Sequence, residues 1–310
     1  MRRFLRYATG WRALVATLVL LAAAAALDPG AALNLVARLN SYRLLDDVGY
    51  GDGPRAKLDV YLPERIDAPG PLVVFFYGGR WSTGERADYR FVGAALATRG
   101  VIAVIPDYSL YPQSRFPVFL EDASRALRWA LDNAERLGAD RARIFVMGHS
   151  AGGHIAAMLA FDPRWLAAVG LSPSSDLAGF IGLAGAYDFA IDSDVLRGVF
   201  GPPANAAAAQ PLRYVTRDAP PALLIAGEAD TTVRPRNTRA LVAAIDAAGG
   251  EGRALYYPGV THREVIGAFS PLLHFLAPVA DDVMAFVGAK RARANKTNER
   301  RVDDRDRDVQ

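Results

Sequence analysis

Residues 144–154 read IFVMGHSAGGH, and this stretch decides the fold. Its first four residues are apolar, with the length and β-branched content of a buried strand, and they run directly into Gly-His-Ser-Ala-Gly-Gly. The alanine-rich residues that follow favour a helix. A serine between small residues at a sharp strand-to-helix turn holds its hydroxyl clear of the backbone, beside the N–H groups that open the helix. The stretch therefore predicts Ser150 as a nucleophile, and the alternative is an ordinary glycine-rich turn.

Short apolar runs alternate with helical patterns along most of the chain. The strand-like runs are residues 58–62, 72–77, 101–105, 144–147, 180–184, 222–226 and 253–257. The helical patterns are residues 31–45, 89–97, 119–137, 151–160, 237–248 and 278–288. This alternation predicts right-handed crossovers, a mainly parallel sheet with helices on both sides, and hence an α/β fold. Ligands of such sheets bind at the carboxyl ends of the strands. The less regular residues 162–214 are interpreted as one strand and a small lid over the substrate pocket.

Length and composition favour one catalytic domain with extensions. The chain has 310 residues and is 51% hydrophobic, enough for a substantial core. Four segments are predicted: a signal peptide or membrane anchor (1–28), a linker or amphipathic helix (29–43), a catalytic domain (44–289) and a disordered charged tail (290–310). The net charge of +3 lies in the two ends, and the mildly acidic centre argues against nucleic-acid binding there.

The N-terminal segment has the pattern of an export or anchoring signal. Four arginines and no acidic residue precede an uncharged, largely apolar run at residues 13–27. Alanines at 23–26 offer a cleavage site, while an uncleaved segment would leave the basic end in the cytoplasm. Both readings predict a periplasmic or membrane-anchored protein whose catalytic domain lies outside the cytoplasm. The alternative is a buried core helix. For the charged tail, the alternative to disorder is a membrane-surface or nucleic-acid role.

A second glycine element follows the second apolar run, where residues 78–81 read GGRW. Acyl transfer develops an oxyanion, and glycines let a loop bring backbone amides close to it. We predict that the amides of Gly79, Arg80 and Ala151 form this oxyanion hole; the alternative is a strand-ending turn. The residues predicted to line the substrate pocket are Trp81 and Tyr187.

A nucleophilic serine requires a histidine to take its proton. The chain has four histidines. His149 and His154 flank the serine locally, and His274 sits in an apolar setting that favours packing. His262 follows a strand and a Pro-Gly turn, which predicts a loop at the carboxyl edge of the sheet. His262 is therefore the predicted base.

The histidine in turn requires a carboxylate that fixes its tautomer. Asp230 lies just past the strand-like run 222–226 and upstream of His262, giving the chain order Ser, Asp, His. Glu228 and Asp188 are the alternatives. Asp230 is the predicted acid.

Several motifs together carry a family resemblance. They are YGGRW at 77–81, WSTGERADY from 81, DYSLYPQSRFPVFLEDASRALRW from 107, GHSAGG from 148, LLIAGEADTTVRP from 223 and YPGVTH from 257. They resemble the α/β-hydrolase esterase/lipase family, in particular bacterial carboxylesterases of the hormone-sensitive-lipase-like and feruloyl-esterase-like type, over roughly residues 44–288. Tyr77 stands in place of the usual oxyanion-loop histidine and Ser109 in place of a frequent arginine, which leaves the substrate open.

The resemblance implies an α/β-hydrolase fold with an eight-stranded, mostly parallel sheet. It also implies a serine esterase with no cofactor and no metal, acting on a small-molecule ester, with Ser150, Asp230 and His262 at the triad positions. The expected reaction is ester hydrolysis through an acyl-enzyme. Two alternative functions would use the same site: an amidase or arylformamidase-like hydrolase, and an acyltransferase. The remaining alternative is a non-catalytic exported binding module.

Overall fold

The computed structural model describes residues 29–289. The predicted signal or anchor (1–28) and the predicted charged tail (290–310) lie outside the described residues. Among residues 29–289, no helix combines the length and the apolar character needed to cross a bilayer.

Eight strands form one sheet in the order β1-β2-β4-β3-β5-β6-β7-β8. The strands are β1 (Tyr42–Gly49), β2 (Lys57–Pro63), β3 (Gly70–Phe76), β4 (Ile102–Pro106), β5 (Ala139–His149), β6 (Gly179–Leu183), β7 (Ala222–Gly227) and β8 (Gly252–Tyr257). β2 pairs antiparallel with β1 and β4, and every other pairing is parallel. The predicted mostly parallel, eight-stranded sheet is confirmed.

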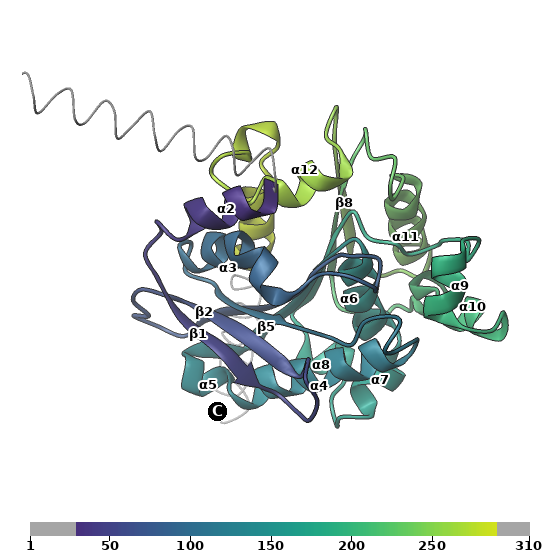
Figure 1. Ribbon diagram of the computed structural model, residues 1–310, viewed down its shortest axis with the longest axis horizontal. Helices are drawn as coiled ribbons and strands as arrows, with labels where there is room; N and C mark the ends of the chain where they lie inside the picture. The colour runs from purple at the N-terminus through teal and green to yellow at the C-terminus, as the bar shows by residue number, and fades with distance from the viewer. Residues whose placement is uncertain (1–28, 290–310) are drawn as a thin grey trace, which may run out of the picture.

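Helices cover both faces of the sheet (Figure 1). The longer ones are α2 (Pro29–Ala37), α3 (Arg90–Ala97), α4 (Val118–Asp132), α6 (Ala151–Phe161), α11 (Arg236–Ala247) and a last helix at residues 279–289. The shorter ones are α5 (Ala134–Leu137), α7 (Pro163–Ala167), α8 (Pro173–Asp176), α9 (Asp194–Phe200), α10 (Ala204–Ala208) and α12 (His262–Gly267). Three 3₁₀ turns are η1 (Arg86–Tyr89), η2 (Pro211–Tyr214) and η3 (His274–Leu276). In Figure 1, α2 and α3 lie over one face and α4, α5, α7 and α8 over the other, while α9 and α10 lie on the right-hand side of the molecule.

The helix predicted at residues 31–45 is wrong in its second half. Helix α2 ends at Ala37, and Tyr42–Gly49 forms strand β1, so the predicted linker or helix at 29–43 also holds the start of the sheet. Strand β1 is an edge strand whose partner is β2, and its register shifts between Leu45 and Val48. Exposed acidic residues near that shift hide the period of two that marks a strand, and pairing with β2 decides the conformation.

The sheet brings the predicted loops to one edge. Strands β3 and β5 are parallel neighbours, with Phe76 opposite Gly148, so the segments that follow them leave the sheet side by side. Strands β7 and β8 continue the parallel sheet on the other side of β6, with Gly227 opposite Tyr257. All four carboxyl ends therefore open onto one edge, where ligands of α/β sheets bind.

Candidate active site

Ser150 lies at a strained turn between β5 and α6. Its φ and ψ are 56° and −119°, a conformation that costs a non-glycine residue free energy and persists only where the surroundings enforce it. A Cβ on Gly148 would lie 2.1 Å from the Gly152 carbonyl oxygen, and one on Gly152 would lie 2.0 Å from the Phe76 carbonyl oxygen. Only glycine fits at either position, and the two glycines let the turn pack tightly against the end of β3.

Residues 78–81, which we call the oxyanion loop, follow the end of β3 and lie against Ser150. Three consecutive residues have positive φ: Gly79 at 130°, Arg80 at 55° and Trp81 at 58°. A Cβ on Gly78 would lie 3.0 Å from the Ser150 Cβ, which places this loop in contact with the serine. The loop therefore turns sharply beside the proposed nucleophile, as its glycines predict.

The amides of this region divide into used and unused donors. The Ser150 N–H donates to the Leu183 carbonyl oxygen at 3.0 Å. In contrast, the N–H groups of Gly79, Arg80 and Ala151 donate to no acceptor within residues 29–289. These are the three amides predicted to hold an oxyanion, and unused donors at the carboxyl edge of a sheet suit that role.

His262 and Asp230 meet at the same edge. His262 opens α12, where Nδ1–H donates to Oδ2 of Asp230 at 2.7 Å. The carboxylate of Asp230 is buried and its Oδ1 accepts the N–H groups of Thr232 and Val233, both at 2.8 Å. The acid is thus fixed by backbone donors, and the histidine keeps Nε2 free to accept a proton.

His149 connects this pair to the serine turn. Its ring lies 4.7 Å from the His262 ring, and its Nε2–H donates to the His262 carbonyl oxygen at 3.1 Å. Burial and the nearby His262 lower the pKa of His149 to about 3, so His149 stays neutral and accepts a proton less readily than an ordinary imidazole. Ser150 Oγ has no hydrogen-bond partner in the described part of the chain. Hydrogen bonds to catalytic serines are often long before a substrate binds.

The rival residues have other partners. His274 is exposed and bonds the Pro271 carbonyl oxygen at 2.9 Å, and His154 is buried against the Ala209 carbonyl oxygen at 2.8 Å. Glu228 pairs with Arg239 at 2.6 Å on the surface. Within residues 29–289, no group of three or more His, Asp or Glu side chains is placed to hold a metal ion.

Sequence reasoning missed the network that supports the oxyanion loop. The Tyr77 hydroxyl donates to Asp107 Oδ1 at 2.8 Å and accepts from Arg55 Nη2 at 2.7 Å. The Tyr108 hydroxyl donates to the Tyr77 carbonyl oxygen at 2.8 Å. Arg86 also pairs with Asp107. Burial raises the pKa of Tyr77 far above its usual range, so its hydroxyl keeps the proton that it donates to Asp107.

The two predicted pocket residues lie in different places. Trp81 is nearly buried and contacts a group that we call the aromatic wall, formed by Phe119, His154, Phe189 and Phe200. Because Trp81 ends the oxyanion loop and His154 lies one turn after Ser150, this wall stands next to the reaction site. Tyr187 is fully buried, and a Cβ on Gly182 would lie 2.0 Å from its hydroxyl. Tyr187 therefore packs against β6 in the core, and its place in the substrate pocket stays a prediction.

The Gly79→Ala variant is expected to lower kcat for ester hydrolysis about 100-fold, the effect of losing one oxyanion donor. Its Cβ would lie 2.0 Å from the Thr83 carbonyl oxygen, so the loop must shift. The matched control is Gly249→Ala, also at positive φ but with nothing within 4 Å of the added Cβ. Steady-state kinetics of both variants measures kcat. An equal loss of kcat in Gly79→Ala and Gly249→Ala would refute a special role for Gly79.

Buried His154 is expected to weaken the fold in acid. Burial lowers its pKa to about 4, whereas the unfolded chain takes up the proton near pH 6.5. The free energy of unfolding should therefore fall as the pH drops from 6.5 towards 4, by roughly 3 kcal/mol in all. Urea unfolding at pH 7 and pH 4 measures this loss. In His154→Gln, an amide can still donate to the Ala209 carbonyl oxygen, and the loss of unfolding free energy between pH 7 and pH 4 should be smaller by about 3 kcal/mol. Equal losses in the variant and the wild type would contradict a contribution from His154.

The chain is similar in sequence to known esterases. A family model described as BD-FAE matches residues 58–245. The chain is 29% identical to an isoprenylcysteine alpha-carbonyl methylesterase of Arabidopsis thaliana, over 93% of this chain and 72% of that protein. It is 31% identical to esterase LipC of Mycobacterium tuberculosis, over 69% of this chain and 58% of that protein.

Solved structures show the same fold. An inhibited esterase B from Lactobacillus rhamnosis superposes with a TM-score of 0.74 at 21% identity, covering 92% of this chain and 99% of that chain. A truncated carbohydrate esterase from gut microbiota superposes with a TM-score of 0.70 at 21% identity, covering 81% of this chain and 96% of that one. At such identities the likeness concerns the fold.

Proposed function

The chain belongs to the BD-FAE family of α/β-hydrolase esterases, and from this premise we propose that it hydrolyses carboxylic esters with Ser150, His262 and Asp230 as a catalytic triad. One observation carries the proposal: Asp230 holds His262 Nδ1 at 2.7 Å beside the turn that carries Ser150. The names of the similar proteins, a methylesterase and an esterase, support the same reaction class.

The mechanism follows from the roles these groups can take. Ser150 Oγ attacks the ester carbonyl carbon while its proton passes to His262 Nε2, and Asp230 stabilises the imidazolium. The unused amides of Gly79, Arg80 and Ala151 stabilise the oxyanion. The leaving alcohol takes the proton from His262. Water then attacks the acyl-enzyme carbonyl carbon while its proton passes to His262 Nε2. The bond between the acyl carbon and Ser150 Oγ breaks, Oγ takes this proton back from His262, and the carboxylic acid leaves.

The reaction class is tested by measuring the products formed from three reactions. These are p-nitrophenyl acetate alone, the matching anilide, and p-nitrophenyl acetate with added methanol. We expect release of acetate from the ester, little from the anilide and no methyl acetate. Faster cleavage of the anilide would identify an amidase, and methyl acetate as the main product an acyltransferase. A folded chain that cleaves neither substrate would contradict the proposal and favour a binding module.

The aromatic wall predicts a short acyl group. Trp81 stacks on Phe189 with ring centres 5.6 Å apart and meets Phe200 edge-on at 4.9 Å, so space next to the oxyanion loop is filled. Trp81→Ala is expected to raise kcat/KM for p-nitrophenyl hexanoate relative to the acetate about tenfold or more. Trp129→Ala, in α4, is the control for general loss of packing. An unchanged ratio in Trp81→Ala would show that acyl length is set elsewhere.

We further propose that the catalytic domain works outside the cytoplasm. The support is sequence alone: four arginines, then the apolar run at residues 13–27. Residues 1–43 fused to a phosphatase that is active only after export should give phosphatase activity in cells. Fractionation then separates a released domain from an anchored one. An inactive fusion, with a fusion to an established export signal active in parallel, would contradict export.

A further inference from the structure

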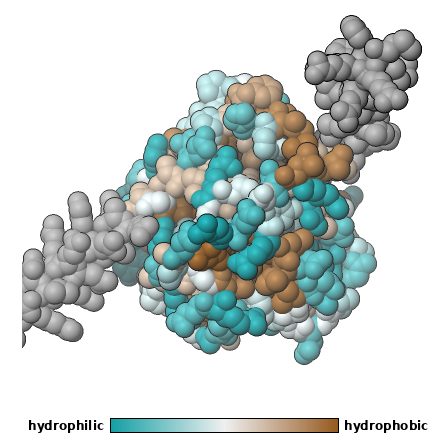
Figure 2. Space-filling view, turned by 90° about the vertical axis from the view of Figure 1, so that its left-hand side faces the viewer, coloured by the Kyte–Doolittle hydropathy of each residue, from teal (hydrophilic) through white to brown (hydrophobic). Residues whose placement is uncertain are grey.

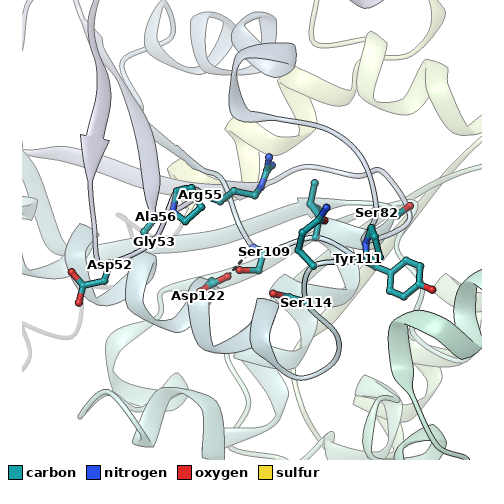
Figure 3. Close-up of a pocket in the computed structure, with 13 residues that line it drawn as sticks. Asp52, Gly53, Arg55, Ala56, Ser82, Ser109, Tyr111, Ser114 and Asp122 are labelled. Atoms are coloured by element: carbon teal, nitrogen blue, oxygen red, sulfur yellow. Dashed lines mark hydrogen bonds between the residues drawn. The ribbon is translucent and has the colours of Figure 1, made fainter.

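A cavity of about 560 Å³ lies beside the oxyanion loop, and none of the proposed catalytic residues lines it (Figure 3). Its walls come from the turn between β1 and β2, from residue 82 just after the oxyanion loop, from the loop after β4, and from α4. The polar side chains that matter here are Arg55, Ser82, Ser109, Gln113, Ser114 and Asp122. The volume falls in the range of small-molecule sites, so the cavity can take a ligand of sugar size.

Two of the three ionised groups of the wall, Arg55 and Asp122, already have partners, and the third, Asp52, is solvent-exposed. Arg55 Nη2 lies 3.3 Å from Asp107 Oδ1. Asp122 is nearly buried, accepts the Ser109 N–H at 2.7 Å (dashed in Figure 3) and pairs with Arg125. A charged ligand would have to compete with these pairs and lose its own hydration, which is costly. The wall therefore favours a neutral ligand.

Other polar groups of the wall are unused. Within the described chain, the hydroxyls of Ser109 and Ser114, the amide of Gln113 and Nη1 of Arg55 form no hydrogen bond. Together they offer donors and acceptors within one cavity, and hydroxyl groups both donate and accept. Apolar surface from Leu110, Pro54 and Ala56 completes the wall.

We propose that this cavity binds a neutral, hydroxyl-rich small molecule, a polyol of monosaccharide size. Its hydroxyls bond Ser109, Ser114, Gln113 and the free Nη1 of Arg55, while its carbon skeleton lies on the apolar part of the wall. The site is separate from the triad.

The cavity also touches the supports of the oxyanion loop. Arg55 Nη2 donates to the Gly84 carbonyl oxygen at 2.8 Å as well as to Tyr77, and the Tyr111 N–H donates to the Trp81 carbonyl oxygen at 2.9 Å. A polyol at this place is either a free ligand or the alcohol half of an ester. The second source rests on the proposed esterase function, whereas binding itself does not.

Saturation-transfer NMR of the full chain with methyl α-D-glucopyranoside tests binding. We expect transfer at millimolar glycoside, and at least a tenfold loss in Ser109→Arg, whose long side chain fills the cavity. Ser41→Arg places the same change at an exposed position outside the cavity and should keep the signal.

A Gln113→Ala/Ser114→Ala double variant, in the exposed loop, should weaken binding at least threefold if Ser109→Arg fails to fold. No transfer to the wild type, or transfer that survives these changes, would overturn the site. Tighter binding of benzoate, agmatine or toluene than of the glycoside would overturn the ligand class.

The two sources of the polyol are separated by kinetics. If the site takes the alcohol half of a substrate, Ser109→Arg lowers kcat/KM for a monoacetylated methyl glucoside at least tenfold relative to p-nitrophenyl acetate, and Ser41→Arg keeps the ratio. If the polyol is a free ligand, the ratio stays constant while the NMR signal is still lost. A chain that cleaves neither ester but binds the glycoside contradicts the esterase and leaves the polyol site standing.

Discussion

The Ser150→Ala variant is expected to lose about 10⁴- to 10⁶-fold in kcat for p-nitrophenyl acetate, since no other group replaces the nucleophile. The turn should survive, because Ser150 N–H donates to the Leu183 carbonyl oxygen at 3.0 Å and this bond involves no side chain. Steady-state kinetics on freshly purified protein measures the loss.

Ser41→Ala is the matched control, because Ser41 is exposed and lies at the start of the sheet, away from the carboxyl edge. It should keep wild-type turnover. Thermal unfolding midpoints of both variants establish that each is folded. Ester turnover by Ser150→Ala at a tenth of the wild-type rate would mean that another residue is the nucleophile.

The Asp230→Asn variant is expected to lower kcat about 10⁴-fold. An asparagine oxygen can still accept the Thr232 and Val233 N–H groups, which bond Asp230 Oδ1 at 2.8 Å, so the loop keeps its shape. The amide nitrogen then faces His262 Nδ1, forcing that nitrogen to accept and placing the proton on Nε2. His262 in this tautomer cannot take the serine proton. Steady-state kinetics of the variant measures the loss of kcat, and its circular dichroism spectrum shows whether the fold is kept.

The rival carboxylate supplies the control. Glu228 lies two residues away and pairs with Arg239 on the surface, so Glu228→Gln should change kcat no more than about twofold, the scale of an exposed ion pair. The reverse result, a large loss in Glu228→Gln and a small one in Asp230→Asn, would assign the acid to Glu228.

Local patterns were sufficient to predict most of the fold. Strand β3 and residues 144–147 of β5 are buried on both faces and appear as continuous apolar runs. The glycines around Ser150 follow from a turn that admits no Cβ. Strand β1 escaped prediction because its conformation depends on a partner distant in sequence and its residues are largely exposed.

In the site, as in the fold, local sequence patterns predicted some features, and contacts between distant segments determined the others. The residues of the proposed triad and oxyanion hole each follow a recognisable strand, so their chain order gave their place at one edge of the sheet. The network of Arg55, Tyr77 and Asp107 joins segments more than 20 residues apart, and no local pattern marks it. The burial of Tyr187 against Gly182 is likewise a product of tertiary packing that no local pattern marks.

Labelling with a fluorophosphonate, followed by peptide mapping, tests the central claim most directly. Such reagents react with a serine that a neighbouring base activates and leave a stable adduct. We predict one adduct per folded chain, on Ser150, with none in Ser150→Ala and none after unfolding in urea. An adduct on any other residue of the folded chain, or a catalytically active chain that takes no label, would contradict Ser150 as the activated nucleophile.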